Sequence, residues 1–277
     1  MFDLDKWQEI FISISKNPLR SALTCISVGL GIFLLIILLG ASKGLQNGAE
    51  SQFKDDAINS IWINAGQTSL PHRGLQPGRY IQFTNQDYEE IRQNIPGVEH
   101  ISGRFYIRGE VTINYGKEYG DFDVRCVHPG HQHVEKTIMV EGRYINPFDI
   151  DQKRKVAVIG KLVKEALFKD GHAIGKYINV NSIPFKVVGV FIDAGAEGEQ
   201  EQVYLPITTA QQAFAGGNRI NRMMLTTGDA TLEEGNIMAE KIRRQLSNRH
   251  NFSMEDPRAV RVNNSMIYFQ RFQNLTS

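Results

Sequence analysis

The sequence has 277 residues, and its 31 Lys and Arg against 30 Asp and Glu give a formal net charge of +1. This balance gives no strong electrostatic case for nucleic-acid binding. Hydrophobic residues make up 42% and charged residues 22%, which excludes a disordered chain. The two cysteines, Cys25 and Cys126, lie far apart and only the first lies in an apolar run, so no disulfide is expected.

The first segment, 1–20, predicts an amphipathic helix at the membrane interface. Leu4, Trp7, Phe11 and Ile14 recur at steps of three and four, which places them on one helical face. An indole ring suits the headgroup region, so Trp7 and Phe11 are expected at the interface. A plain surface helix packed on protein is the alternative.

Two basic residues, Lys16 and Arg20, stand on either side of Pro18, which is expected to break this first helix. Both are expected at the membrane interface, just before an apolar run. Basic residues near the end of a span favour the cytoplasmic side, so the N-terminus is predicted to be cytoplasmic.

The apolar run, 21–42, contains no Asp, Glu, Lys, Arg or His. As a helix it would extend about 33 Å, enough to cross a bilayer core of about 30 Å. A buried helix of a soluble protein and a cleaved signal peptide are the alternatives, but the leader is long and contains Asp3 and Asp5. We therefore predict a retained transmembrane helix, in which Gly29 and Gly31 allow close helix packing.

After the span, 43–56 predicts a polar stalk helix. The pattern then becomes α+β, and 57–118 together with 220–262 predicts one porter-like subdomain with an antiparallel sheet. Its expected elements are strand 57–65, a helix through Ile95 capped by Thr84, strands 98–107 and 110–115, strand 221–227, helix 231–249 and strand 259–262. The last segment, 263–277, predicts the start of a second stalk helix.

Between these two segments, 119–219 predicts an inserted β-rich subdomain. Its expected elements are strand 122–127, a short helix at 131–137, a turn at Asn146-Pro147, strand 155–159, helix 161–168, a hairpin at 175–191 that turns at Ser182-Ile183-Pro184, and helix 208–214 capped by Thr208.

The inserted segment also contains an acidic, glycine-rich stretch at 193–201, which predicts a solvated and mobile loop. Its acidic residues are candidates for contact with a partner protein: Asp193, Glu197, Glu199 and Glu201.

His128, His131 and His133 form a cluster that could bind a metal ion with Asp123 or Cys126 nearby. Pro129 and Gly130 favour a loop without a rigid ligand frame, so a solvated turn is the competing interpretation. Whether the cluster binds metal stays open.

No active site is predicted. Asp121 and Asp123 share one face of a strand, but paired acid–base catalysis is not expected there. The sequence contains no G-x-S-x-G, no Walker-type loop and no C-x-x-C. Neither enzymatic activity nor a cofactor is therefore predicted.

Four continuous tracts occur in a characteristic order. The first is the leader NPLRSALTCISVGLGIFLLI. The others are MVEGRYINPFDIDQKRKVAVIGKLVKEALF, HAIGKYINVNSIPFKVVGVF and VYLPITTAQQAF. In this order the tracts resemble the permease subunits of the MacB/FtsX/LolC type of ABC transporter, and the leader is similar to the start of these subunits.

This resemblance implies a transmembrane helix and then a periplasmic porter-like subdomain interrupted by an inserted one, in the bacterial inner membrane. It implies an ABC ATPase subunit, a homo- or hetero-dimeric permease partner, a periplasmic adaptor protein and membrane lipid as partners, and no nucleic acid. It also implies C-terminal transmembrane helices that this sequence does not contain, so a truncated permease is expected.

We therefore predict a non-catalytic permease subunit that couples ATP hydrolysis by a partner ATPase to extracytoplasmic export or mechanical work. The alternative is a single-pass, membrane-anchored periplasmic binding or scaffold module without transport activity. An anchored metalloenzyme that uses the histidine cluster is the third hypothesis.

Overall fold

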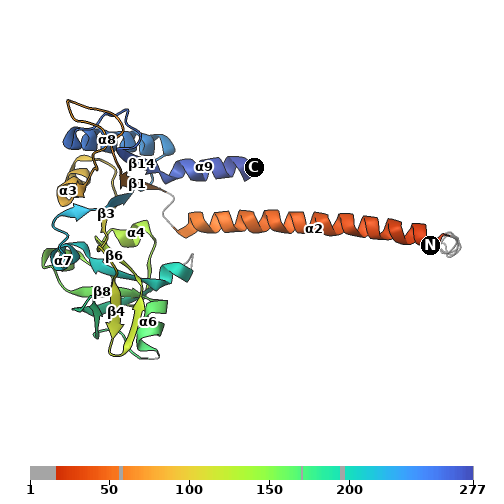
Figure 1. Ribbon diagram of the computed structural model, residues 1–277, viewed down its shortest axis with the longest axis horizontal. Helices are drawn as coiled ribbons and strands as arrows, with labels where there is room; N and C mark the ends of the chain where they lie inside the picture. The colour runs from red at the N-terminus through yellow and green to blue at the C-terminus, as the bar shows by residue number, and fades with distance from the viewer. Residues whose placement is uncertain (1–16, 56–58, 170, 194–196, 277) are drawn as a thin grey trace. The chain divides into compact units, whose positions relative to one another are not determined.

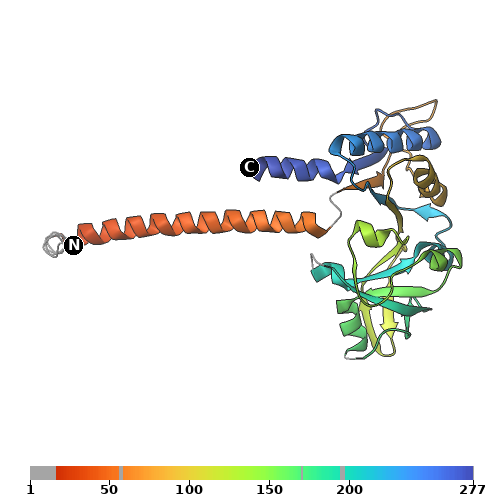
Figure 2. The same ribbon diagram turned by 180° about the vertical axis from the view of Figure 1, so that it is seen from behind.

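The computed structural model describes residues 17–55, 59–169, 171–193 and 197–276 (Figures 1 and 2). It separates into two units, Met1–Ser51 and Gln52–Ser277. Most of the predicted interfacial helix, with Trp7, Phe11 and Lys16, lies outside the described residues.

The first unit is dominated by helix α2 (Pro18–Asp55). Its stretch Pro18–Gly44 has a mean hydropathy of 2.8 and is long and apolar enough to cross a membrane. Pro18 is the first residue of this helix, where a residue needs no backbone N–H to donate. The predicted break of a preceding helix stays a prediction, because residues 1–16 lie outside the described residues. The carbonyl of Arg20, which is exposed, accepts a hydrogen bond of 2.9 Å from Thr24 Oγ1.

The second unit is built on one mixed, twelve-stranded sheet of described residues. In sheet order the strands are β14 (Val260–Asn264), β1 (Ser60–Ala65), β13 (Arg222–Thr226), β3 (His100–Phe105), β6 (Asp123–Val127), β11 (Gln202–Pro206), β8 (Val156–Gly160), β10 (Ile183–Ile192), β9 (Tyr177–Val180), β4 (Thr112–Tyr115) and β5 (Glu118–Asp121), and β7 (Ile138–Gly142) pairs with β10. We call β14, β1, β13 and β3 the upper half and the other strands the lower half, as they lie in Figure 1.

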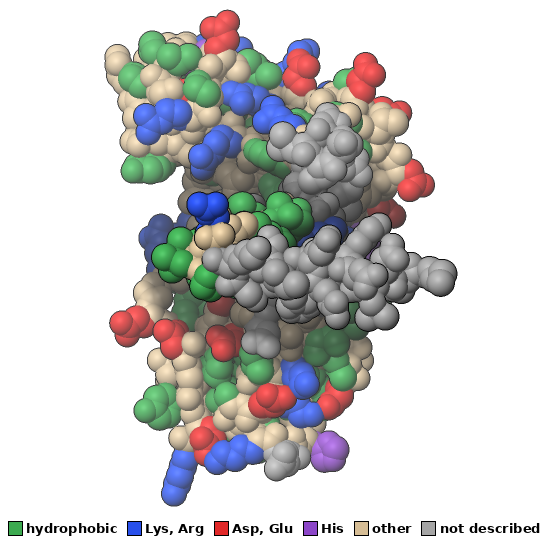
Figure 3. Space-filling model, turned by 90° about the vertical axis from the view of Figure 1, so that its right-hand side faces the viewer, with side chains coloured by type: hydrophobic (Ala, Val, Ile, Leu, Met, Phe, Trp, Pro, Cys, Tyr) green, Lys and Arg blue, Asp and Glu red, His purple; other side chains and the backbone are tan. Residues whose placement is uncertain are grey.

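The helices of this unit are α3 (Asn85–Asn94), α4 (His131–Val134), α5 (Pro147–Asp151), α6 (Lys161–Phe168), η1 (Glu197–Glu201), α7 (Ile207–Ala213), α8 (Leu232–His250) and α9 (Ser265–Thr276), and a small ladder joins β2 (Phe83–Thr84) to β12 (Arg219–Ile220). Helices α3 and α8 accompany the upper half and α6 the lower half (Figure 1). Charged side chains of both signs lie on both halves of the face that Figure 3 shows.

The α+β fold class is confirmed. The strands of the upper half pair antiparallel, as predicted for the porter-like segments, whereas the lower half also contains parallel pairs. Strand β8 runs parallel to β10, and β6 runs parallel to β11. Parallel neighbours need a crossover connection, which α6 and β9 provide between β8 and β10.

Three local predictions are wrong. The turn at Asn146-Pro147 is the start of helix α5, where Asn146 and Asp149 form a capping box. The 175–191 hairpin turns at Asn181 and Ser182, which both have positive φ as a tight hairpin turn demands. Helix α7 begins directly after Pro206, so Thr208 is not its cap.

Strand β4 differs in its position. It belongs in sequence to the predicted porter-like segment 57–118, but it pairs with β5 and β9 of the lower half. The subdomain division at 57–118, 119–219 and 220–262 otherwise stays a prediction.

Most buried apolar side chains form one core that runs through both halves of the sheet. In β1, Ile61 and Ile63 belong to this core, and side chains alternate along a strand, so Trp62 and Asn64 lie on the opposite face. A second, smaller core contains Val127, Tyr144, Ile145, Val158, Phe191 and Tyr204.

Candidate functional site

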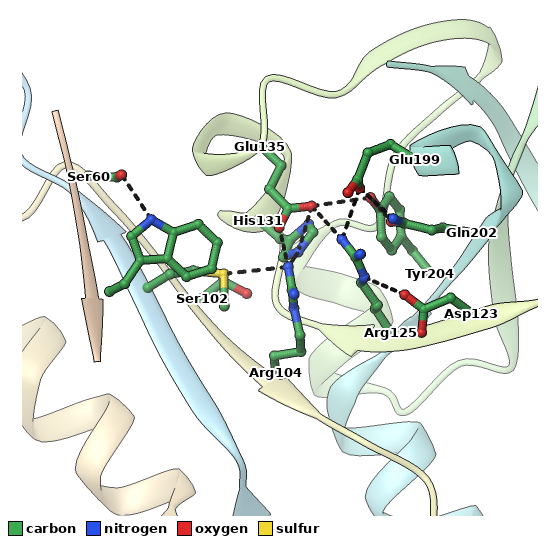
Figure 4. A network of polar contacts seen from close by, with 12 residues as sticks. Ser60, Ser102, Arg104, Asp123, Arg125, His131, Glu135, Glu199, Gln202 and Tyr204 are labelled. Atoms are coloured by element: carbon green, nitrogen blue, oxygen red, sulfur yellow. Dashed lines mark hydrogen bonds and ion pairs between the residues drawn. The ribbon is translucent and has the colours of Figure 1, made fainter. Parts of the chain in front are cut away.

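The two halves of the sheet meet where β3 pairs with β6, and this pairing is short. It consists of Arg104 opposite Val127 and Phe105 opposite Cys126. Next to this junction lies a mainly buried group of charged and polar side chains from both halves (Figure 4). We call this group the junction network, and its members are Arg104, Asp123, Arg125, His131, Glu135, Glu199, Gln202 and Tyr204.

Strand alternation places the two arginines of the network. In β6, Val124 and Cys126 enter the main core, which turns Arg125 to the opposite face. In β3, Ile101 and Phe105 enter the core, which turns Arg104 to that same face. Two cations are thereby brought together beside the short helix α4, which packs on β3.

Glu135, directly after α4, is the centre of the network. One carboxylate oxygen forms an ion pair with Arg104, and the other accepts a hydrogen bond of 3.0 Å from Arg125 Nη1. His131 lies one helical turn earlier, with its Nε2 3.5 Å from Glu135 Oε2 and 2.8 Å from Arg104 Nη2. Figure 4 shows Glu135 between the side chains of both halves.

The network continues into the lower half through Arg125. Its Nη1 lies 3.1 Å from Glu199 Oε2 and its Nε lies 2.8 Å from Asp123 Oδ2. Gln202 donates to Glu199, and the Tyr204 hydroxyl donates a 2.8 Å hydrogen bond to Gln202 Oε1. Helix η1 and β11 are thus joined to the same charge cluster.

A glycine of the sequence motif VAVIG permits this arrangement. A Cβ at Gly160 would overlap the backbone carbonyl of Gln200 in η1. Only glycine therefore allows η1 to cross so close to the end of β8 and to present Glu199 to Arg125.

Burial and charge set the protonation of the network. Burial alone would raise the pKa of the Glu135 carboxyl, but the opposing effects of His131, Arg104 and Arg125 lower it to about 2. Burial lowers the pKa of His131 to about 3, against the attraction of Glu135. At neutral pH the network therefore holds an ionised Glu135, two arginine cations and an uncharged His131.

This arrangement can hold the two halves of the sheet together, but it offers no catalytic chemistry. The Glu135 side chain is 7% exposed and that of Arg104 is 5% exposed, so solvent screens their attraction poorly. The Tyr204 hydroxyl has its pKa raised by burial, so it remains protonated.

The three predicted histidines do not form one site. His128 is buried, accepts a hydrogen bond of 3.0 Å from Gly103 N and stacks on Tyr88. His131 is buried in the junction network, and the exposed His133 stacks on His100. The solvated turn is therefore wrong for two of them.

No group of three His, Cys, Asp or Glu side chains suited to a metal is found in the part of the chain that the structure describes.

The acidic loop residues are less solvated than expected. Asp193 is buried, and Glu199 is held by Arg125. Glu201 is exposed, whereas the side chain of Glu197 lies outside the described residues. Their role in partner contact stays a prediction.

Sequence reasoning missed Arg104, Arg125 and Glu135. The available signal was an arginine inside each of two predicted strands, GRF in β3 and VRCV in β6. A charge within such a strand requires a buried partner. The sequence did not identify that partner, because Glu135 follows a short helix and meets the arginines only in the folded chain.

We expect the free energy of unfolding to decrease as the pH is lowered from about 6.5 to about 3. Burial lowers the pKa of both His128 and His131 to about 3, from an ordinary 6.5. In that window the unfolded chain binds more protons than the folded chain, so stability rises with pH by about 1.4 kcal/mol per pH unit for each histidine.

Urea titrations of the full chain at several pH values would measure this slope. In the variant His128→Gln, the histidine contribution to the pH dependence of the unfolding free energy should be roughly half that of the wild type, whatever the stability of the variant at pH 7. An unchanged slope in that variant would contradict the prediction.

The sequence model of the family described as MacB-like periplasmic core domain matches residues 21–238. The macrolide export ATP-binding/permease protein MacB of Chlorobaculum tepidum is 25% identical over 97% of this chain and 41% of its own length. The protein of that name from Bdellovibrio bacteriovorus is 26% identical over 79% of this chain and 34% of its own length. The chain thus spans about a third to two fifths of the length of these relatives.

Two solved structures share the fold. The periplasmic region of MacB from Actinobacillus actinomycetemcomitans aligns with a TM-score of 0.64 and 20% identity, over 80% of this chain and 96% of that chain. The extracellular domain of the noncanonic ABC-type transporter YknZ from Gram-positive bacteria aligns with a TM-score of 0.61 and 21% identity, over 74% of this chain and 100% of that chain.

Proposed function

The chain belongs to the family of MacB-like periplasmic core domains, and on that premise we propose that it is a non-catalytic permease component of a MacB-type ABC transporter. It would couple ATP hydrolysis by a partner ATPase to export or mechanical work outside the membrane. The observation that carries this proposal is one continuous family match from residue 21 to residue 238, which includes both the apolar helix and most of the sheet domain.

The chain's own connections suggest where mechanical work would enter the domain. Helix α2 precedes β1, β14 leads directly into α9, and β1 and β14 are hydrogen-bonded neighbours. A movement of α9 would therefore reach β14, the edge strand of the upper half.

From that edge a series of contacts leads to the lower half. Ser265 of α9 lies 3.0 Å from Ser60 Oγ, which accepts a hydrogen bond of 3.1 Å from Trp62 Nε1. The guanidinium of Arg104 lies 5.9 Å from the Trp62 ring centre, and Arg104 pairs with Glu135. We propose that the junction network makes both halves of the sheet move as one body.

The partners follow from the same proposal. An ABC ATPase would supply the energy, and a homo- or hetero-dimeric permease partner would pack against α2 at Gly29 or at Gly31, which lie on different faces of the helix. A Cβ at either glycine would meet no described atom of this chain within 4 Å, so another helix has room to approach. The lower half and the exposed Glu201 would contact a periplasmic adaptor protein.

Co-purification tests this function. The full chain, expressed in a bacterial membrane and extracted in mild detergent, should recover an ABC ATPase in about equal amount. A matched control is the variant with Leu34→Arg and Ile37→Arg, which removes the membrane anchor and should lose that ATPase. Recovery of the chain without any ATPase would support the anchored binding or scaffold module instead.

A further inference from the structure

The face of the upper half that carries Trp62 holds three arginines in one row across four strands. Arg104 of β3 is directly opposite Arg222 of β13, and Arg222 is directly opposite Asn64 of β1. Asn64 is in turn opposite Arg261 of β14. Directly opposed residues share a face with their Cβ atoms about 5 Å apart, so these side chains are neighbours.

The charges in this row are not balanced within the chain. Arg104 is paired with Glu135, but in the part of the chain that the structure describes no carboxylate lies within ion-pair distance of Arg222 or Arg261. Arg222 lies over the Trp62 ring, 5.7 Å from its centre. Like charges on opposed strand residues destabilise a sheet, so the row favours an external counter-charge.

Arg104 itself is not accessible to a ligand. It is 4% exposed, and its guanidinium is held inside the chain by Glu135 and His131. The accessible cations of the row are therefore Arg222, which is partly buried, and Arg261, which is exposed.

We propose that Arg222, Arg261 and Asn64, with Trp62 beside them, form a binding site for a phosphate-bearing ligand. Two uncompensated guanidinium groups match a dianion, whereas a single carboxylate would neutralise only one of them. Neighbouring strands are about 4.8 Å apart, so the backbones of the two arginines are about 10 Å apart, with Asn64 between them. Two arginine side chains can reach across this distance and bind one phosphate or diphosphate. This proposal does not rest on the transport function.

The residues beside the arginine row indicate which kind of ligand would fit. Trp62 lies opposite Met224 on one side and Asn263 on the other. The partly buried indole ring adds an apolar surface directly beside the arginines. This favours a phosphate group attached to an apolar or aromatic part, which either a soluble phosphate ester or a phospholipid headgroup could provide.

Fluorescence offers a direct test, because the chain has two tryptophans and one lies in the site. In the Trp7→Phe variant, Trp62 is the only reporter. The full chain in nanodiscs of neutral phosphatidylcholine would be titrated with pyrophosphate and with phenyl phosphate, and a parallel sample would contain phosphatidic acid. Binding of the soluble probes identifies a soluble ester, and a response to phosphatidic acid alone identifies a headgroup.

Arg222→Gln and Arg261→Gln should each weaken binding at least about tenfold, because each removes a charged donor. Arg108→Gln is the matched control, since Arg108 is exposed and the variant removes the same charge elsewhere. The proposal is overturned if no probe binds, if acetate binds as tightly as pyrophosphate, or if Arg222→Gln binds like the control. None of these readouts involves an ATPase, so they are independent of the co-purification result.

Discussion

Glu135→Gln is expected to lower the free energy of unfolding by about 3–5 kcal/mol, because it removes one partner of a buried ion pair. Arg125 would keep Asp123 and Glu199, but Arg104 would lose its only carboxylate among the described residues. The cost therefore comes mainly from leaving the guanidinium of Arg104 buried without a counter-charge.

The decrease in unfolding free energy caused by Glu135→Gln should also depend on pH. The folded-state pKa of Glu135 is about 2, below the ordinary value of 4.5. A carboxyl with a depressed pKa stabilises the folded state above its unfolded pKa and loses that effect as the pH falls. The difference in unfolding free energy between wild type and Glu135→Gln should therefore be largest above about pH 4.5 and should decrease towards pH 2.

Urea denaturation followed by circular dichroism would measure this effect. The control is Glu240→Gln, which breaks an ion pair with Arg244 on the surface, where both side chains are more than 60% exposed, and should cost at most about 1 kcal/mol. Adding Arg104→Met to Glu135→Gln should recover part of the loss, because the unpaired cation is then removed. Equal effects of Glu135→Gln and Glu240→Gln would contradict a stabilising role for the junction network.

Leu34→Arg combined with Ile37→Arg is expected to release the chain from the membrane. Both residues lie within the apolar part of α2, and the chain itself buries neither of them: Leu34 is 50% exposed and Ile37 is 49% exposed. Each arginine near the centre of a span costs about 2.5–3.5 kcal/mol, so the pair costs about 5–7 kcal/mol.

Alkaline extraction of membranes would measure this release. Wild type should remain in the pellet at its full mass, whereas the double-arginine variant should move to the supernatant. Leu34→Phe with Ile37→Leu is the matched control and should stay in the pellet. Circular dichroism of the released variant should show an intact domain, because residues 52–277 form a separate compact unit. Retention of the arginine variant, or a cleaved wild type, would contradict a membrane anchor in α2.

Sequence patterns alone located most of the secondary structure. Helix 161–168 was placed at its observed bounds, and Thr84 and Thr231 were placed correctly at helix starts. These features are local: capping residues, side-chain periodicity and a run of apolar residues each leave their signal within a few neighbouring positions. The family motifs identified the fold for the same reason, since they lie in continuous tracts.

The tertiary structure decided which distant residues meet. Strand β4 lies with the lower half because its hydrogen-bond partners are β5 and β9, and no short pattern records that choice. The same holds for Glu135, which reaches Arg104 from a position 31 residues away. The row of Arg104, Arg222 and Arg261 depends on the register of four strands. A shift of one residue in any strand would turn its arginine to the other face, so only the folded sheet could bring these charges together.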